Sequence, residues 1–290
     1  MNLLLQTIAN GVLIGGIYAA LAIGFQLAFG VLDVVDFAVG GWAMLGGYAG
    51  YWASVLLGLG LVPTLPAAFV LFAIVGFLIG PMIYRVRSSR YARPALMALA
   101  FTFGLATLMR GGALTLWGFD TRSITTALGG ASATVGPMTL PLLRLVTFGL
   151  AAGASVALIV FLYATRLGLA IRATAENRDY AAMAGVDVRR VSAIVYGIYT
   201  GLTATVGVLL AAIYSVTPEV GIRYTLLAFF VVVMAGLGSV TGVLVAGLVL
   251  GLLEALVTVY LSASYAFLAV FAVLYLVLLV APAGVLRRAG

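Results

Sequence analysis

The sequence of 290 residues contains no cysteine, no histidine and no lysine, and only 8% of its residues are charged. The absence of cysteine and histidine excludes disulfides, thiolate chemistry and imidazole metal ligands or bases. Without lysine the chain can form neither a Schiff base nor a standard phosphate-binding P-loop, which needs a lysine after its glycine-rich turn. We therefore expect no cofactor, no metal site, and any nucleotide hydrolysis to occur on another chain.

Apolar residues take the place of the missing charges, at 64% of the chain with a mean hydropathy of +1.25. Apolar runs of about 20 residues recur, each long enough to cross a hydrocarbon core of about 30 Å. Strand-like alternation is absent, which argues against an outer-membrane barrel. We expect an all-α polytopic membrane protein forming one integral domain, 1–290. Its expected segments are 3–29, 34–58, 62–84, 95–117, 141–165, 191–214, 225–238, 241–262 and 265–282.

The start of the chain, MNLLLQTIANG, has no basic region and no small-residue cleavage site. We interpret it as the approach to the first span and not as a signal peptide.

All fifteen cations are arginines, and most of them gather at three places beside the apolar segments. These are Arg85, Arg87, Arg90 and Arg93, then Arg166, Arg172, Arg178, Arg189 and Arg190, and finally Arg287 and Arg288. The positive-inside rule places these clusters in the cytoplasm and the loops 118–140 and 215–224 outside. Counting spans then places the N-terminus outside. This position beside membrane spans also argues against a nucleic-acid partner.

Two segments are irregular. Segment 225–238 is too short to span alone and ends in Gly236, Leu237 and Gly238. Stretch 30–41 holds Asp33, Asp36 and Gly40 between apolar runs, and is either a cytoplasmic turn or a broken helix at membrane depth.

The chain has 36 glycines, and small residues recur four positions apart, as at Gly247 and Gly251. This spacing lets helices approach closely in lipid. We favour packing within the chain over contact with a partner subunit.

Seven of the 23 charged residues lie between positions 172 and 190. The stretch predicts a short amphipathic helix that begins after an N-cap at Thr174, carries Glu176 and Asp179 on its polar side, and ends before Gly185. It is either a solvated loop or a rigid knob on which a soluble partner docks.

Three stretches resemble one known family. "GLAIRATAENRDYAAMAGVDVRRV" (168–191) resembles the coupling loop of the LivH-type permeases of branched-chain amino-acid ABC importers. "FGVLDVVDFAVGGWAMLGGY" (29–48) and "MAGLGSVTGVLVAGLVLGLLEAL" (234–256) are similar to two further signatures of that family.

The resemblance implies ABC-importer permease architecture in a bacterial or archaeal cytoplasmic (inner) membrane. The implied partners are a second, LivM-like permease subunit, two cytoplasmic ATPase subunits and an external or periplasmic solute-binding protein. The implied ATPase-coupling residues are Ala175, Glu176, Asp179, Ala182 and Gly185.

The sequence departs from the family where Asn-Phe-Ala-His-Gly-Glu is replaced by residues 36–41, DFAVGG. The solute is therefore left open between branched-chain amino acids and other small polar solutes such as urea, amides or carboxylates. The candidate pathway residues are Asp33, Asp36, Phe37, Gly40, Gly236, Gly238 and Glu254.

A carboxylate at membrane depth usually faces a polar cavity or a partner. On a helix, Asp33 and Asp36 would share a face; alternatively, both are helix caps in a turn. For Glu254 the alternative is a structural hydrogen bond to a neighbouring helix. A further set near the outer helix ends is interpreted as anchors or as contacts with the binding protein: Arg110, Arg144 and Arg223.

Two other classes compete with an importer permease. A proton-coupled secondary transporter could use these carboxylates and would need no ATPase, but it leaves the 174–184 helix unexplained. A membrane-embedded enzyme would have to work without histidine, cysteine or lysine.

Overall fold

The structure is a computed structural model that describes residues 2–89, 93–126, 130–135, 138–236 and 240–280. Their apolar sequences are helical because a backbone in lipid must satisfy its own hydrogen bonds. The helices are α1 (Asn2–Leu32), α2 (Val39–Leu57), α3 (Leu61–Arg87), α4 (Pro94–Trp117), α5 (Leu142–Ala164), α6 (Arg166–Glu176), α7 (Arg178–Met183), α8 (Val188–Ile213), α9 (Val220–Ala235), α10 (Val240–Tyr260) and α11 (Ala263–Val280).

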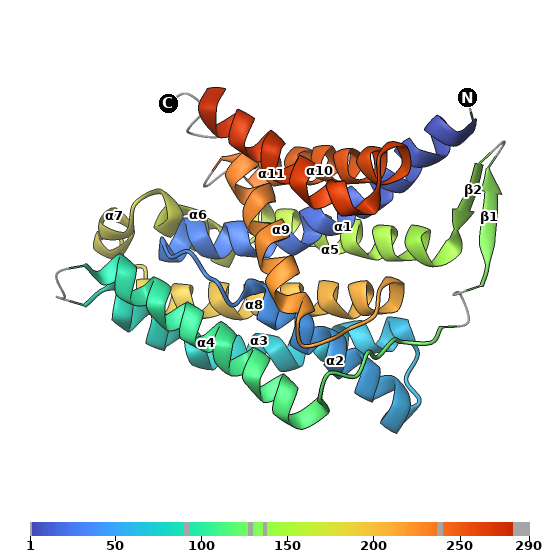
Figure 1. The fold of residues 1–290 in the computed structure, drawn as a ribbon. Helices are drawn as coiled ribbons and strands as arrows, with labels where there is room; N and C mark the ends of the chain where they lie inside the picture. The colour runs from blue at the N-terminus through green and yellow to red at the C-terminus, as the bar shows by residue number, and fades with distance from the viewer. Residues whose placement is uncertain (1, 90–92, 127–129, 136–137, 237–239, 281–290) are drawn as a thin grey trace.

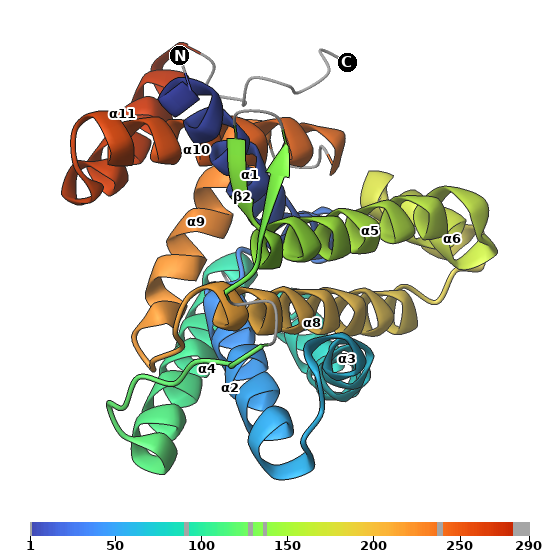
Figure 2. The same cartoon turned by 90° about the vertical axis from the view of Figure 1, so that its right-hand side faces the viewer.

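All nine expected apolar segments are confirmed as helices, namely α1 to α5 and α8 to α11. Among the residues that the structure describes, seven helices are long and apolar enough to cross a membrane; α2 and the shorter α9 complete the nine. Helix α9 begins five residues earlier than expected, at Val220, and at about 1.5 Å per residue is about 24 Å long. It crosses the direction of α8 in both views (Figures 1 and 2).

The two ends of the bundle differ in structure (Figure 1). One end carries a β-hairpin, not predicted from the sequence, in which β1 (Ser132–Val135) pairs antiparallel with β2 (Met138–Pro141). The start of α1 lies there, since Gln6 Nε2 donates to the carbonyl oxygen of Thr139 at 3.2 Å.

The opposite end carries α6, α7 and the ends of α1 and α3. It also holds the described arginines of the two internal clusters, so the positive-inside rule assigns it to the cytoplasm. This topology agrees with the predicted external N-terminus. Arg90, Arg287 and Arg288 lie outside the described residues.

Helix α8 lies at the centre and packs against α1, α2 and α3. Its Tyr196 and Tyr199 are buried together with Trp42 of α2. Small residues allow the closest helix contacts: a Cβ on Gly251 would lie 2.3 Å from the Cα of Gly15, where α10 meets α1. The small-residue faces described here therefore pack within the chain, as the favoured interpretation expected.

Candidate translocation and coupling site

The charged stretch forms two helices and not the single helix predicted from Thr174 to Ala184. The break is at Asn177, whose Oδ1 accepts hydrogen bonds from the backbone N–H groups of Asp179 and Tyr180 and so caps α7. Thr174 is buried inside α6, where its hydroxyl donates to the carbonyl oxygen of Ala170. The prediction failed because the stretch holds two residues that can cap a helix, Thr174 and Asn177. Thr174 is buried against the bundle, so Asn177 is the one that caps.

The predicted end of the helix at Gly185 is confirmed. Its φ of +86° is a left-handed conformation that favours glycine, and its N–H donates to the carbonyl oxygen of Ala182 at 3.0 Å. The five expected coupling residues, Ala175, Glu176, Asp179, Ala182 and Gly185, are all exposed. Tyr180 and Met183, which belong to the apolar side of the predicted helix and not to the expected coupling set, are 72% and 83% exposed. We call α6, α7 and Gly185 the knob.

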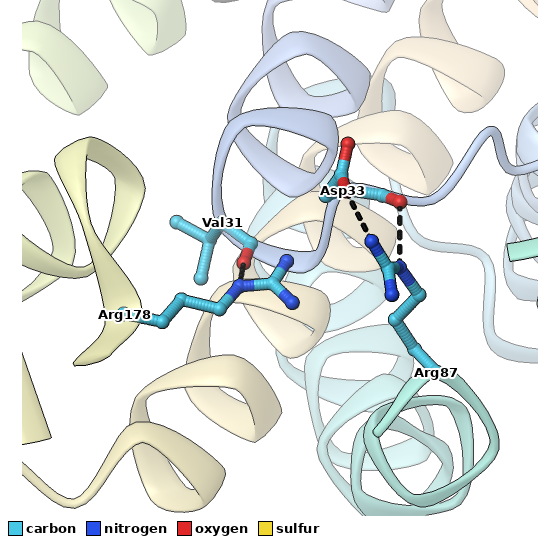
Figure 3. Close-up of polar contacts among 4 residues, drawn as sticks. All are labelled: Val31, Asp33, Arg87 and Arg178. Atoms are coloured by element: carbon cyan, nitrogen blue, oxygen red, sulfur yellow. Dashed lines mark hydrogen bonds and ion pairs between the residues drawn. The ribbon is translucent and has the colours of Figure 1, made fainter. Parts of the chain in front are cut away.

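The knob is fastened to the end of α1 by Arg178 (Figure 3). The Nε of Arg178 donates to the carbonyl oxygen of Val31 at 2.9 Å. This carbonyl belongs to the last turn of α1, where backbone acceptors lack helical partners and the helix dipole favours a cation. Burial, and then the nearby charge of Arg87, lower the pKa of Arg178 from its ordinary value.

Asp33 follows the last turn of α1 and has a φ of +49°, which is strained for a residue with a side chain. Two bonds from Arg87 hold it there (Figure 3). The Nε of Arg87 donates to the carbonyl oxygen of Asp33 at 3.2 Å, and its Nη2 forms an ion pair with the carboxylate. Asp33 thus joins the ends of α1 and α3.

Asp36 points in the opposite direction, into the bundle, and is almost fully buried. Its Oδ1 accepts from the N–H of Ala38 at 2.7 Å and its Oδ2 accepts from the hydroxyl of Tyr196 at 2.8 Å. Residues 33–36 are not helical, so of the two alternatives the stretch is a turn, and Asp33 and Asp36 do not share a helix face. The carboxylate of Asp36 instead links the turn before α2 to the central helix α8.

Phe37 and Gly40 meet α9 through Thr225. The hydroxyl of Thr225 accepts from the N–H of Gly40 at 3.1 Å and lies 3.3 Å from the carbonyl oxygen of Phe37. The backbones touch here: a Cβ on Gly40 would lie 1.8 Å from the carbonyl oxygen of Gly221. Sequence reasoning missed Thr225, because a lone threonine in an apolar helix gives no sign of a contact 185 residues away.

Gly236 ends α9 with a φ of +86°, as the predicted helix break requires. Its carbonyl oxygen accepts from Nε2 of the buried Gln26 of α1 at 3.0 Å. Gln26 is a second residue that sequence reasoning missed. Gly238 lies outside the described residues.

Glu254 lines a different cavity, of about 990 Å³. Its Oε1 accepts from Nη2 of Arg223 at 3.0 Å. Arg144 lines the same cavity and donates to Oδ1 of Asn10 at 3.2 Å. The interpretation of Arg144 and Arg223 as simple helix-end anchors is therefore incomplete, because both contribute charge to a cavity wall.

A second cavity, of about 290 Å³, lies on the other side of α9. Phe37 and Phe103 line it with their ring centroids 6.2 Å apart, and so does Arg110, which pairs with Glu219. Leu226 of α9 lines both cavities. Helix α9 therefore separates two cavities, one reached by Phe37 and one by Glu254.

Apolar helices around a charged cavity, with an exposed helical knob at the arginine-rich end, define a multi-pass membrane transport protein. Residues 7–281 match the family described as "Branched-chain amino acid transport system / permease component", and the chain belongs to this family. It is a permease component, and a multi-pass protein of the cytoplasmic (inner) membrane.

The chain is similar over nearly its whole length to named permeases. The high-affinity branched-chain amino acid transport system permease protein LivH of Salmonella typhimurium, strain LT2, is 33% identical over 98% of this chain and 96% of that protein. LivH of Escherichia coli K12 has the same identity and coverage. The corresponding permease BraD of Pseudomonas aeruginosa is 30% identical over 98% of this chain and 96% of its own. No solved structure matches the chain.

Proposed function

We propose that the chain forms the translocation pathway of an ATP-driven importer and couples that pathway to ATPase subunits through the knob. The observation that carries this proposal is one continuous series of contacts from the knob to α9. Arg178 bonds the end of α1, Asp33 and Asp36 follow directly, and Gly40 bonds Thr225 of α9. A displacement of the knob thereby reaches the wall between the two cavities.

The knob has the properties that a docking element needs. It is helical, and Asn177 and Gly185 fix its start and end. Arg178 ties it to the bundle, while Tyr180 and Met183 leave an apolar face in water. Ala175, Glu176, Asp179, Ala182 and Gly185 form the surface that meets the ATPase in this proposal.

Hydrolysis belongs to two cytoplasmic ATPase subunits, because this chain lacks the lysine of a P-loop. A second permease subunit completes the pathway, and an external solute-binding protein delivers the solute to the hairpin end. A proton-driven carrier would leave the exposed knob without a role.

In the proposed pathway, Phe37 is an apolar gate between the cytoplasmic turn and the second cavity. Asp36 and Gly40 lie beside this gate at the start of α2, and Gly236 ends α9 at its other end. Gly238, outside the described residues, is part of the same proposal by its sequence position alone. Asp33 takes part through its tie to Arg87. Glu254 acts at the cavity of about 990 Å³, which we call the external cavity.

The solute of the proposed importer is a branched-chain amino acid, as the names of the similar permeases suggest. Uptake of L-leucine into proteoliposomes containing the complete transporter, with ATP inside and the binding protein outside, tests this. Uptake that depends on ATP and on the permease supports the proposal. ATP-independent uptake driven by a proton gradient would contradict it.

A variant tests the gate. Phe37→Ala should raise ATP hydrolysis in the absence of solute, because removing the ring opens the contact with Phe103. Phe119→Ala is the control, since Phe119 is exposed in the external loop. Equal solute-free hydrolysis in both variants would remove Phe37 from the gate.

A further inference from the structure

The external cavity is placed where a solute released outside arrives first. The start of α1, the start of α9 and the junction of α10 and α11 surround it. The start of α1 and the junction of α10 and α11 lie towards the hairpin end of the bundle, while the start of α9 lies near its middle (Figure 1). Its volume of about 990 Å³ exceeds what one amino acid needs, so binding there depends on particular groups on the wall.

Those groups carry charges of both signs. Glu254 is only 17% exposed, and its Oε2 is buried beside the phenol of Tyr18, with no described residue donating a hydrogen bond of ordinary geometry to it. Arg223 is 53% exposed, and within the described chain only its Nη2 meets an acceptor. Arg144 adds a second guanidinium on the same wall.

The rest of the wall near these charges is apolar. Ile222 and Leu226 of α9 line the cavity together with Phe267 and Val270 of α11. The cavity thus combines two carboxylates, two guanidinium groups and an aliphatic and aromatic surface. Glu219 is paired with Arg110, which does not line this cavity, whereas Glu254 is paired with Arg223 on the cavity wall itself.

We infer that this cavity binds the zwitterionic head group of an aliphatic α-amino acid, with Arg223 and Arg144 on the carboxylate and Glu254 on the ammonium group. The apolar wall takes the side chain. This inference rests on the proposed function and names the site at which the solute first meets the permease. Guanidinium groups bind carboxylates with paired hydrogen bonds, and Oε1 of Glu254, which now accepts from Arg223, accepts from the ammonium group once that guanidinium turns to the solute.

The same charges disfavour the other solutes that the sequence left open. Urea and simple amides are neutral and need no pair of opposite charges. A simple carboxylate would bind the guanidinium groups but would also face the carboxylate of Glu254, which repels it. Only a solute with both charges satisfies the wall.

The existing ion pair does not block such a solute. The guanidinium of Arg223 is 53% exposed, so the solute can separate it from Glu254 and replace each partner with one of its own groups. The resulting affinity is modest, which suits a site that must release its solute with each transport cycle.

Equilibrium binding of tritiated L-leucine to the complete permease–ATPase complex in nanodiscs, without binding protein, tests the inference. Glu254→Gln and Arg223→Gln should each weaken leucine binding about tenfold or more. L-leucinamide, which lacks the carboxylate, should compete poorly with leucine in the wild type. 4-Methylpentanoate, which lacks the ammonium group, should gain in Glu254→Gln, because the repelling carboxylate is gone. Asp120→Asn, an exposed acidic residue outside the cavity, is the control and should bind as the wild type does.

A double variant separates binding from a structural role. Arg223→Glu with Glu254→Arg keeps an ion pair between α9 and α10 but exchanges the positions of the two charges. A purely structural pair predicts that this variant regains wild-type leucine binding, which would overturn the inference. Recovered thermal stability with weakened leucine binding supports it.

Two failures are distinguishable. If the complete wild-type transporter takes up no leucine, the proposed solute is wrong and the inference falls with it. If the wild type takes up leucine but the single variants bind and transport it normally, the proposed function stands and the cavity is not the site.

Discussion

Near the end of α1, Arg87 and Arg178 both donate hydrogen bonds to backbone carbonyl oxygens. Arg223 instead donates to the side chain of Glu254, on the wall of a large cavity. An arginine that donates to a backbone carbonyl oxygen makes the two segments move together. A pair of side chains, in contrast, can separate while the helices that carry them stay in place. The first arrangement suits transmission of force, and the second suits exchange with a solute.

The largest expected effect is that of Gly40→Leu, because Gly40 lies where the start of α2 contacts α9. Any Cβ there would lie 1.8 Å from the carbonyl oxygen of Gly221, so the two helices must separate. We expect leucine uptake to be lost while the protein still inserts in the membrane. Gly104→Leu is the matched control, since a Cβ at Gly104 meets no described atom within 4 Å. Normal uptake by Gly40→Leu would show that this contact transmits nothing.

Arg178→Gln should have the next largest effect, because it releases the knob from the end of α1. We expect solute-stimulated ATP hydrolysis to fall about tenfold, which corresponds to about 1.4 kcal/mol of coupling free energy. Basal hydrolysis should change little. The exposed Arg189 provides the control variant Arg189→Gln. If both variants keep full stimulation, the knob acts without its tie to α1.

Tyr196→Phe tests the inward link and should act on stability more than on coupling. The variant removes the donor to the buried Oδ2 of Asp36 and the acceptor of the Trp42 indole. Leaving buried polar groups unpaired costs about 1–3 kcal/mol, which should lower the thermal unfolding temperature of the purified protein. Tyr48→Phe is the comparison, because the buried hydroxyl of Tyr48 meets no partner within the described chain. Equal unfolding temperatures of the two variants would refute the link.

The smallest effect is expected from Gly185→Ala, which changes only the backbone conformation at the end of the knob. A Cβ there meets no described atom within 4 Å, so the cost is the strain of a left-handed residue, about 1–2 kcal/mol. Stimulated ATP hydrolysis should fall about two- to threefold as the knob shifts, as measured on the reconstituted complex. Gly185→Asn, which tolerates this conformation better, should fall less. The reverse order would exclude strain as the cause.

The sequence was sufficient for features set by neighbouring residues. Apolar runs predicted nine of the helices, and Gly185 predicted the end of the knob, because both depend on local backbone chemistry. The break at Asn177 was missed, since choosing between two capping residues requires knowing that Thr174 is buried against the bundle. The hairpin at 132–141 was missed because four-residue strands carry little pattern.

The candidate site was less predictable than the fold. Asp33 and Asp36 were correctly singled out, but only the structure shows that one points outward to Arg87 and the other inward to Tyr196. Thr225 and Arg223 gained their roles through contacts with residues far away in the sequence. Such long-range pairing leaves no spacing pattern in a single chain.

The coupling between the two ends can be measured at Thr258, an exposed residue on the external cavity. The chain has no native cysteine, so Thr258→Cys reports alone. Labelling by an impermeant maleimide from outside, in the reconstituted transporter with and without vanadate-trapped nucleotide, should differ by about fivefold or more, on the scale of ordinary allosteric coupling. In the Arg178→Gln background the two rates should become equal. An unchanged rate difference in that background would contradict coupling through the end of α1.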